Sequence, residues 1–340
     1  MPQALRLGIA GLGRLGRRHA DNLVHRTRGC VLAAACSPVP EELVHARDAL
    51  GVARLYEHYE QLVQDPELDA VVLVTPTALH ADQAILALEA GKHVFIEKPL
   101  ALNLHDCERV EAVAAGRPQQ VAMVGFVRRF DRSYANAFAQ VSEGGIGRPF
   151  LVRSQTCDRL DPSGFFVRFA PSSGGLFMDC SVHDIDLARW MLGQPKATRA
   201  FASGTIAVPH DLAPLGDVDN AMGIVEFEGG ARAMFYASRT FAHGHEPSTE
   251  VIGTEGKLLV GAGAARDRVV LSDRHGVRQQ AVDDFFERFA NAFEQEMQAF
   301  VDACCGRRPV PLTLQDATEA TRIGLALTAS LKSGEVQVIS

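Results

Sequence analysis

The first 125 residues of this 340-residue chain alternate short apolar runs with longer segments in which apolar residues recur at helical spacing. The runs are apolar almost throughout, which is typical of parallel strands that are buried on both faces by the helices between them. We therefore predict a first domain, residues 1–125, built as a doubly wound parallel sheet. The expected strands are 5–10, 31–35, 70–74, 93–96 and 121–125, and the expected helices are 17–26, 41–50, 79–90 and 104–115.

The remaining residues, 126–340, are assigned to a second α/β domain with a different pattern. Residues 220–239 predict two strands joined by Gly229 and Gly230, which is a hairpin signal. Both faces of this hairpin are partly apolar, so we expect helices to cover one face and another subunit to cover the other. Further hairpins of the same sheet are expected at 251–260 and 267–282, and closing helices at 285–304 and 314–332.

Polar residues interrupt one apolar helical segment, 174–193. One stripe of this helix, at about 100° per residue, carries Asp179, His183, Asp186 and Trp190. Apolar residues flank the stripe, so it should face the protein interior. Buried carboxylates and imidazoles are costly unless they are hydrogen-bonded. The stripe is therefore either a satisfied structural pair or part of a site, and the helix alone leaves both interpretations open.

The first strand runs directly into a glycine loop, residues 11–16, and then into a helix. Gly11 allows the tight turn, Gly13 lets the backbone approach a pyrophosphate, and Gly16 lets helix and strand pack closely. The N–H groups of the helix N-terminus would face the phosphates. The loop, which also contains Arg14 and Leu15, is thus expected to bind a nicotinamide dinucleotide.

The residue that should select the cofactor is Ser37, after the second strand. A carboxylate at this place would bind the ribose 2′-hydroxyl and reject a 2′-phosphate. Serine is compatible with either group, and no arginine follows it directly to pair a phosphate. Arg14 could do so, or could stack over the adenine. The sequence therefore predicts NAD or NADP, with NAD favoured.

Other cofactor neighbours are expected where later strands end, because ligands bind at the carboxyl edge of such sheets. Thr75 and Pro76 follow the strand at 70–74. We expect them to border the cofactor together with His80.

The next strand ends in Glu97, Lys98 and Pro99 at the same edge. A residue that precedes proline is held extended, which fixes Lys98. A lysine beside a nicotinamide can polarise an alcohol oxygen, whereas the alternative is a surface salt bridge to Glu97. Adjacent strand residues face opposite ways, so that salt bridge is geometrically poor. We interpret Lys98 as a site residue and Glu97 as a neighbour of the cofactor.

Composition excludes several classes of protein. The chain has 34 basic and 41 acidic residues, a net charge of −7, and no basic cluster interleaved with aromatics, which argues against a nucleic-acid partner. Its apolar runs are too short to span a bilayer and its N-terminus lacks a signal pattern, so we expect a cytoplasmic protein without a membrane partner. The seven cysteines show neither a CxxC pair nor zinc spacing. We expect reduced thiols and no metal.

Five stretches occur in an order and spacing that resembles the family of glucose-fructose oxidoreductases and inositol dehydrogenases, over nearly the whole chain. They read GLGRLG, TPTALH, GKHVFIEKPL, GFVRRFD and GGLFMDCSVHDIDLARW. Within the family, the chain looks most like the inositol 2-dehydrogenase branch. The resemblance implies a Rossmann domain followed by an α/β domain whose large, mostly antiparallel sheet mediates dimers or tetramers. It also implies hydride transfer between a nicotinamide and a polyol or sugar carbinol, with myo-inositol or scyllo-inositol as the expected substrate and the ketone inosose as product.

The resemblance also assigns chemical roles. It makes His183 the general base that removes the alcohol proton, Lys98 the group that orients the hydroxyl and stabilises its developing charge, and Asp179 the holder of a substrate hydroxyl. Ser37 departs from the acid that many NAD-using inositol dehydrogenases carry, which leaves the cofactor preference open.

Further residues are placed by the same resemblance. One of Arg128 and Arg129 is expected at the substrate, and Asp158 is a further substrate candidate. Asp184 and Asp186 are assigned to structure.

Two alternative functions are left open by the residues. The chain could be another sugar or sugar-acid dehydrogenase or reductase of the same family, because the sequence does not show which hydroxyl epimer fits. A non-catalytic dinucleotide-binding regulator is the second alternative. Such a regulator would not need Lys98 and His183, and this chain retains both.

Overall fold

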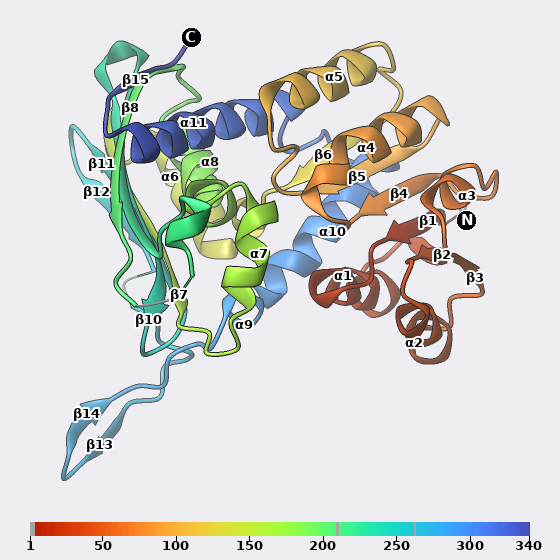
Figure 1. Cartoon of the computed structure of the whole chain (residues 1–340), viewed down its shortest axis with the longest axis horizontal. Coiled ribbons are helices and arrows are strands. Elements are labelled where there is room, and N and C mark those ends of the chain that lie inside the picture. Colours follow the sequence, from red (N-terminus) through yellow and green to blue (C-terminus); the bar gives the residue numbers. More distant parts are fainter. Residues whose placement is uncertain (1–3, 209–210, 262) are drawn as a thin grey trace. The chain divides into compact units, whose positions relative to one another are not determined.

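A computed structural model describes residues 4–208, 211–261 and 263–340 (Figure 1). The chain divides into two compact units, one of Met1–Phe130 with Asn291–Thr318 and one of Asp131–Ala290 with Glu319–Ser340. The sequence predicted a single boundary after residue 125. The structure differs because α10 (Ala290–Cys304) brings apolar side chains back into the core of the first unit, and a single cut cannot describe that return.

The sheet of the first unit has six parallel strands in the order β3-β2-β1-β4-β5-β6. This is a doubly wound sheet, as the apolar runs predicted, and its order reverses between β1 and β4, where such folds bind dinucleotides. The short β3 was not predicted, because three half-buried residues carry too little apolar pattern. The strands are β1 (Leu5–Ala10), β2 (Cys30–Cys36), β3 (Arg54–Tyr56), β4 (Ala70–Leu73), β5 (His93–Glu97) and β6 (Ala122–Gly125).

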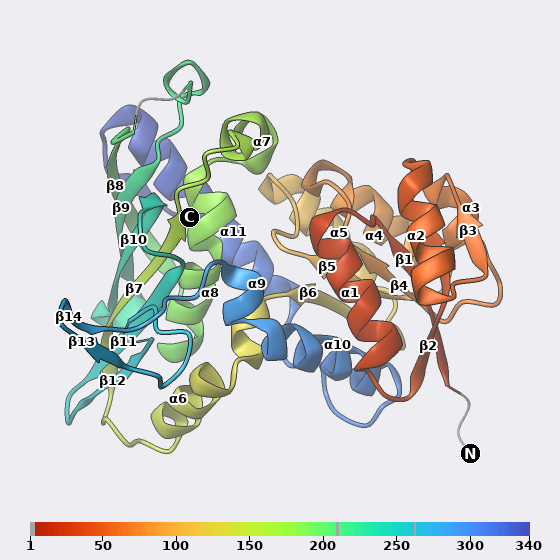
Figure 2. The ribbon, with the colours of Figure 1, turned by 90° about the horizontal axis from the view of Figure 1, so that it is seen from below.

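Helices cover both faces of this sheet (Figure 2). Apolar residues of α1, α2 and α10 join those of β1 and β2 in one core, while Leu62 of α3 and Leu68 contact the opposite face at Gly8. Local signals explain the helix ends: α2 begins at Pro40, and Gly51 ends it with a φ of 69°. The helices are α1 (Arg14–His25), α2 (Pro40–Leu50), α3 (Tyr59–Val63), α4 (His80–Glu89) and α5 (Leu104–Ala115), with short turns η1 (Thr77–Leu79) and η2 (Val127–Phe130).

The second unit is built on a seven-stranded sheet in the order β12-β11-β7-β10-β9-β8-β15. Only β10 and β7 pair in parallel; the other neighbours are antiparallel, so the sheet is mostly antiparallel, as expected. The predicted hairpin is β9 and β10, joined through η5 (Glu228–Gly230). The strands are β7 (Pro149–Arg159), β8 (Ala197–Thr205), β9 (Asn220–Phe227), β10 (Arg232–Phe241), β11 (Glu246–Gly253), β12 (Lys257–Val260) and β15 (Gln337–Val338).

One predicted hairpin does not join this sheet. β13 (Leu271–Asp273) and β14 (Gly276–Arg278) pair with each other as a separate two-stranded sheet that projects from the unit (Figure 1). The prediction that it extends the large sheet was wrong. All six of its strand residues are exposed, so no buried side chain ties the hairpin to the large sheet.

Among the described residues, helices cover one face of the large sheet and leave the other uncovered (Figure 2). α8 contacts β7 and β10, and a Cβ on Gly223 of β9 would lie 2.7 Å from Leu327 of α11. The helical elements are α6 (Arg132–Ser142), α7 (Phe165–Ser173), η3 (Phe177–Ser181), α8 (Val182–Met191), η4 (Ala213–Leu215), α9 (Phe285–Arg288) and α11 (Leu314–Ser333). In the described part of the chain, no helix combines the length and the apolar character that crossing a membrane requires.

Candidate active site

The loop between β1 and α1 is shaped by glycines. Gly11 has a φ of +87°, and a Cβ there would lie 2.4 Å from the carbonyl oxygen of Val74. A Cβ on Gly16 would lie 2.0 Å from the carbonyl oxygen of Gly11, so neither position admits a side chain. Above Gly13, by contrast, the nearest atom to a Cβ is Oε1 of Glu42 at 4.0 Å.

This open space lies at the start of α1, whose first N–H groups have no side-chain cap. Uncapped N–H groups and the helix dipole favour an anion, and the absent Cβ of Gly13 lets a pyrophosphate approach the backbone. Arg14 is exposed and Leu15 is half-buried in the first turn of this helix. The loop therefore fits the phosphates of a dinucleotide.

Ser37 is buried directly after β2, with 1% of its surface exposed. Its Oγ donates a hydrogen bond to Oε2 of Glu42 at 2.6 Å and accepts one from the backbone N–H of Val39 at 3.1 Å. A carboxylate thus stands beside the position where the sequence lacked one, supplied by the first turn of α2. The sequence reasoning missed Glu42, although an acid in the first turn of the helix after the second strand was a visible signal.

The segment after β4 is held by His80. The Nε2 of His80 is 2.9 Å from the carbonyl oxygen of Thr75, and its Nδ1 is 2.9 Å from that of Pro99. Burial lowers the pKa of His80, although both hydrogen bonds oppose this shift. His80 therefore links the turns after β4 and β5, which places Thr75 and Pro76 at the sheet edge.

Lys98 is half-buried at the end of β5, between the buried Glu97 and Pro99. The carboxylate of Glu97 turns to the protein interior, where its Oε1 lies 2.7 Å from Nε2 of His19. Its Oε2 accepts a hydrogen bond from the backbone N–H of Lys98 at 3.0 Å. The Glu97 side chain therefore positions the backbone that carries Lys98.

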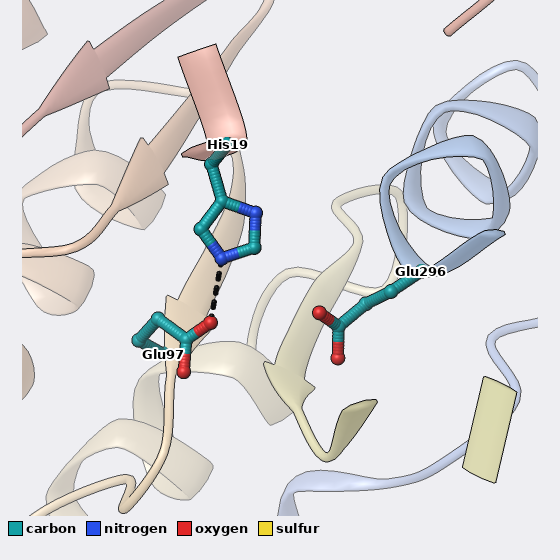
Figure 3. A group of neighbouring side chains, drawn as sticks. All are labelled: His19, Glu97 and Glu296. Atoms are coloured by element: carbon teal, nitrogen blue, oxygen red, sulfur yellow. Dashed lines mark hydrogen bonds and ion pairs between the residues drawn. The ribbon is translucent and has the colours of Figure 1, made fainter. Parts of the chain in front are cut away.

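A third titratable side chain, Glu296 of α10, completes this buried cluster (Figure 3). Among the described residues, His19, Glu97 and Glu296 bring three potential metal-ligand atoms within 4.8 Å of one another, whereas the sequence indicated no metal site. Burial, together with the charge of Glu97, raises the pKa of Glu296 well above its ordinary value of 4.5. Burial beside Glu97 therefore favours the protonated form of the Glu296 carboxyl.

In the second unit, Asp179 lies in η3, a single π-helical turn, and His183 lies in the first turn of α8. π-Helical turns are frequent at functional sites. Both side chains are half-buried, although Met178 and Val182 beside them are fully buried. The stripe predicted to face the interior is therefore partly accessible here, and only Asp186 on it is buried.

Asp179 accepts a hydrogen bond from Nη2 of Arg239 at 2.6 Å. The Arg239 guanidinium is buried and lies 4.2 Å from the ring centre of Phe166. Arg239 pairs with the Asp179 carboxylate and orients it. Neither Arg239 nor Phe166 was predicted. The position of Arg239 near the end of an expected strand was the one available signal.

Asp158, at the end of β7, belongs to the same region of the second unit. Its carboxylate lies 2.9 Å from Nδ1 of His245 and accepts a hydrogen bond from the thiol of Cys180 at 3.6 Å. Burial disfavours the charged form of Asp158, but the hydrogen bond with His245 and the charge of Arg239 outweigh burial and lower its pKa. The region therefore holds an ionised carboxylate at Asp158.

The remaining predicted residues are buried. Asp184 accepts hydrogen bonds from Oγ of Ser154 at 2.7 Å and Oγ1 of Thr156 at 2.6 Å, which accords with its structural assignment. Arg128 and Arg129 lie in η2, and Nη1 of Arg129 is 3.5 Å from a carboxylate oxygen of Asp316. Arg129 thus anchors the start of α11.

Comparisons with known proteins identify the family. Residues 5–126 match the oxidoreductase family with an NAD-binding Rossmann fold, and residues 134–259 match the GFO/IDH/MocA C-terminal domain. The chain belongs to the GFO/IDH/MocA oxidoreductase family. The resemblance inferred from the motifs is thereby confirmed, and the first unit is an NAD-binding Rossmann domain.

Full-length relatives in this family are similar throughout. The chain is 36% identical over 334 residues to scyllo-inositol 2-dehydrogenase (NAD(+)) of Bacillus subtilis, covering 98% of this chain and 96% of that protein. It is 32% identical over 329 residues to myo-inositol 2-dehydrogenase of Thermotoga maritima, covering 96% of each. The structure of scyllo-inositol dehydrogenase from Lactobacillus casei with NAD(H) and scyllo-inositol matches with a TM-score of 0.95, 36% identity and 99% coverage of both chains.

Proposed function

We propose that this protein is an NAD-dependent dehydrogenase that oxidises one secondary alcohol of scyllo-inositol or myo-inositol to the ketone. The observation that carries the proposal is the accessibility of three polar side chains. Lys98, Asp179 and His183 are each half-buried within stretches whose neighbouring side chains are buried. Stability alone does not require a lysine, a carboxylate and an imidazole at these positions, and alcohol oxidation uses all three.

The proposed roles follow from the chemistry of each group. His183 accepts the hydroxyl proton as a general base. Lys98, positioned by the Glu97 carboxylate, stabilises the negative charge that develops on the alcohol oxygen. Asp179, oriented by Arg239, accepts a hydrogen bond from a neighbouring substrate hydroxyl. Bound NAD supplies the hydride acceptor for the carbinol hydrogen.

Two further residues are proposed as substrate neighbours. We propose that one of Arg128 and Arg129, which lie side by side in η2, meets the substrate. We propose that Asp158, held ionised by His245, supports the same polyol.

We also propose that the protein is a homo-oligomer, a dimer or a tetramer, assembled through the large sheet. Its uncovered face exposes apolar side chains, with Met222 63% exposed, Leu259 55% and Ile224 45%, around a hollow of about 700 Å³. A contiguous apolar face of this kind is typical of a subunit interface. The free thiols of all seven cysteines suit a reducing compartment, and we propose a cytoplasmic location.

The decisive experiment is turnover by the purified full-length protein with NAD against a panel of inositols, aldoses and sugar acids, followed by the absorbance of reduced nicotinamide. We expect an inositol to give the highest kcat/KM. A higher value for an aldose or a sugar acid would place the protein elsewhere in the family. Binding of NADH without turnover of any polyol would place it among non-catalytic dinucleotide-binding regulators.

A further inference from the structure

We propose that Glu42 is the residue by which this chain selects NAD over NADP. Its carboxylate would accept the hydrogen bond of the adenosine ribose 2′-hydroxyl and repel a 2′-phosphate. The usual place for such a carboxylate is directly after β2, where this chain has Ser37. Glu42 therefore supplies from α2 the charge that the strand end lacks. The proposal rests on the use of a nicotinamide dinucleotide and not on the identity of the polyol.

The position of Glu42 satisfies two requirements at once. Its Oε2 lies 2.6 Å from Oγ of Ser37, which places the carboxylate at the end of β2. Its Oε1 lies 4.0 Å from the point where a Cβ would stand on Gly13, which places it beside the glycine loop. These two elements flank the adenosine half of a dinucleotide in a doubly wound sheet. One carboxylate therefore faces the space between them.

The surroundings hold this carboxylate in place. Ser37 is buried, and its backbone N–H donates to the carbonyl oxygen of Tyr56 at 3.1 Å, so its hydroxyl is a fixed donor. Glu42 also lies in the first turn of α2, where the helix dipole favours negative charge. Ser37 is thus a positioning residue for Glu42.

A 2′-phosphate in the same space would bring up to about two negative charges against Glu42. The 2′-hydroxyl of NAD is instead a donor that a carboxylate accepts well. Rejection by repulsion and selection by hydrogen bonding act in the same direction. If Glu42 served only as an acidic helix start and a partner for Ser37, its removal would not change the ratio of the two cofactors.

The test compares Glu42→Gln with Glu41→Gln in the full-length protein. Glutamine keeps the size of the side chain and an oxygen for Ser37 but removes the charge, and Glu41 is an exposed acid in the same helical turn. We would measure the Kd of NADH and of NADPH by nicotinamide fluorescence, and kcat/KM with NAD and NADP at a saturating inositol. We expect the wild type to prefer the non-phosphorylated cofactor by at least about 100-fold.

Glu42→Gln should narrow this ratio by at least about 10-fold, mainly through tighter NADPH binding, and Glu41→Gln should leave it within about 2-fold. Ser37→Ala should narrow the ratio part of the way, because it releases the carboxylate without removing it. An unchanged ratio in Glu42→Gln, or an equal change in Glu41→Gln, would overturn the proposal. Since the binding ratio needs no turnover, a shifted ratio without polyol oxidation would support Glu42 while refuting the proposed function.

Discussion

Replacing Glu296 by glutamine should stabilise this protein, and the gain should increase as the pH rises. Glu296 is 0% exposed, and neither of its carboxylate oxygens has a hydrogen-bond partner among the described residues. Its raised pKa keeps the carboxyl neutral in the folded state over a range in which the unfolded chain ionises it. Glutamine has nearly the shape of the protonated acid and does not titrate.

The magnitude follows from proton linkage. Below the unfolded pKa, near 4.5, both states are protonated and the stability that Glu296 contributes is fully present. As the pH rises from there toward the higher folded pKa, that stability is lost by about 1.4 kcal/mol per pH unit. Between pH 4.5 and pH 7 this loss of stability reaches at most about 3.5 kcal/mol, and the substitution Glu296→Gln removes the loss.

The assay is equilibrium urea unfolding at pH 5, 6, 7 and 8, followed by far-UV circular dichroism, with and without a metal chelator. The matched control is Glu294→Gln, on the same helix, where a half-exposed carboxylate lies 3.9 Å from Arg26. The free-energy difference between Glu296→Gln and wild type should increase with pH, and that of the control should stay flat. A flat difference for Glu296→Gln, or a wild type that the chelator destabilises, would refute the protonated state and favour a cation between His19, Glu97 and Glu296.

Three further outcomes are expected. His183→Ala should lower the rate of inositol oxidation by about 10²-fold to 10⁴-fold and remove the acid limb of the pH–rate profile, because only neutral imidazole accepts a proton. The control His243→Ala, at an exposed histidine, should change neither the rate nor the profile. Lys98→Ala should lower kcat severely with little change in the Kd of NADH. The double variant Lys98→Ala/His183→Ala should lose far less activity than the product of the two single-variant losses, and independent effects would contradict a shared substrate oxygen. Ile224→Asp, at a side chain 45% exposed on the uncovered sheet face, should yield monomers in sedimentation analysis with the far-UV spectrum unchanged, and an unaltered assembly would exclude this face as the interface.

Much of the first unit could be predicted from local pattern. A strand that is buried on both faces must be apolar throughout. The apolar runs that form β1, β2, β4, β5 and β6 could therefore be predicted without knowing which strands they pair with. The glycine loop could also be predicted from a local pattern. The crowding at Gly16 comes from Gly11, only five residues earlier, because one strand joins one helix tightly, whereas the crowding at Gly11 comes from Val74 and depends on the fold.

The hydrogen-bond partners of Ser37 and Glu97 became clear from the fold. From the sequence, Ser37 stands where a carboxylate is expected. In the structure the turn into α2 brings the carboxylate of Glu42 to the Ser37 hydroxyl. The sequence predicted Glu97 as a neighbour of the cofactor. Nothing in its strand indicates that its carboxylate lies 2.7 Å from His19, which is 78 residues away in the chain.

Sequence periodicity records whether a side chain is buried, and the tertiary structure decides which side chains are buried together. Glu296 has an apolar helical face around it, so its burial could be expected, but its meeting with Glu97 depends on the return of α10 to the first unit. Asp179 was likewise predicted as part of a polar stripe on one helical segment, and the packing of η3 against β10 brings Arg239 to its carboxylate. The sequence by itself determined which elements form and which residue types can carry chemistry, because these depend on neighbours along the chain. The fold decided the orientation of those residues wherever the partner is distant in sequence, as for Glu97 with His19 and Asp179 with Arg239.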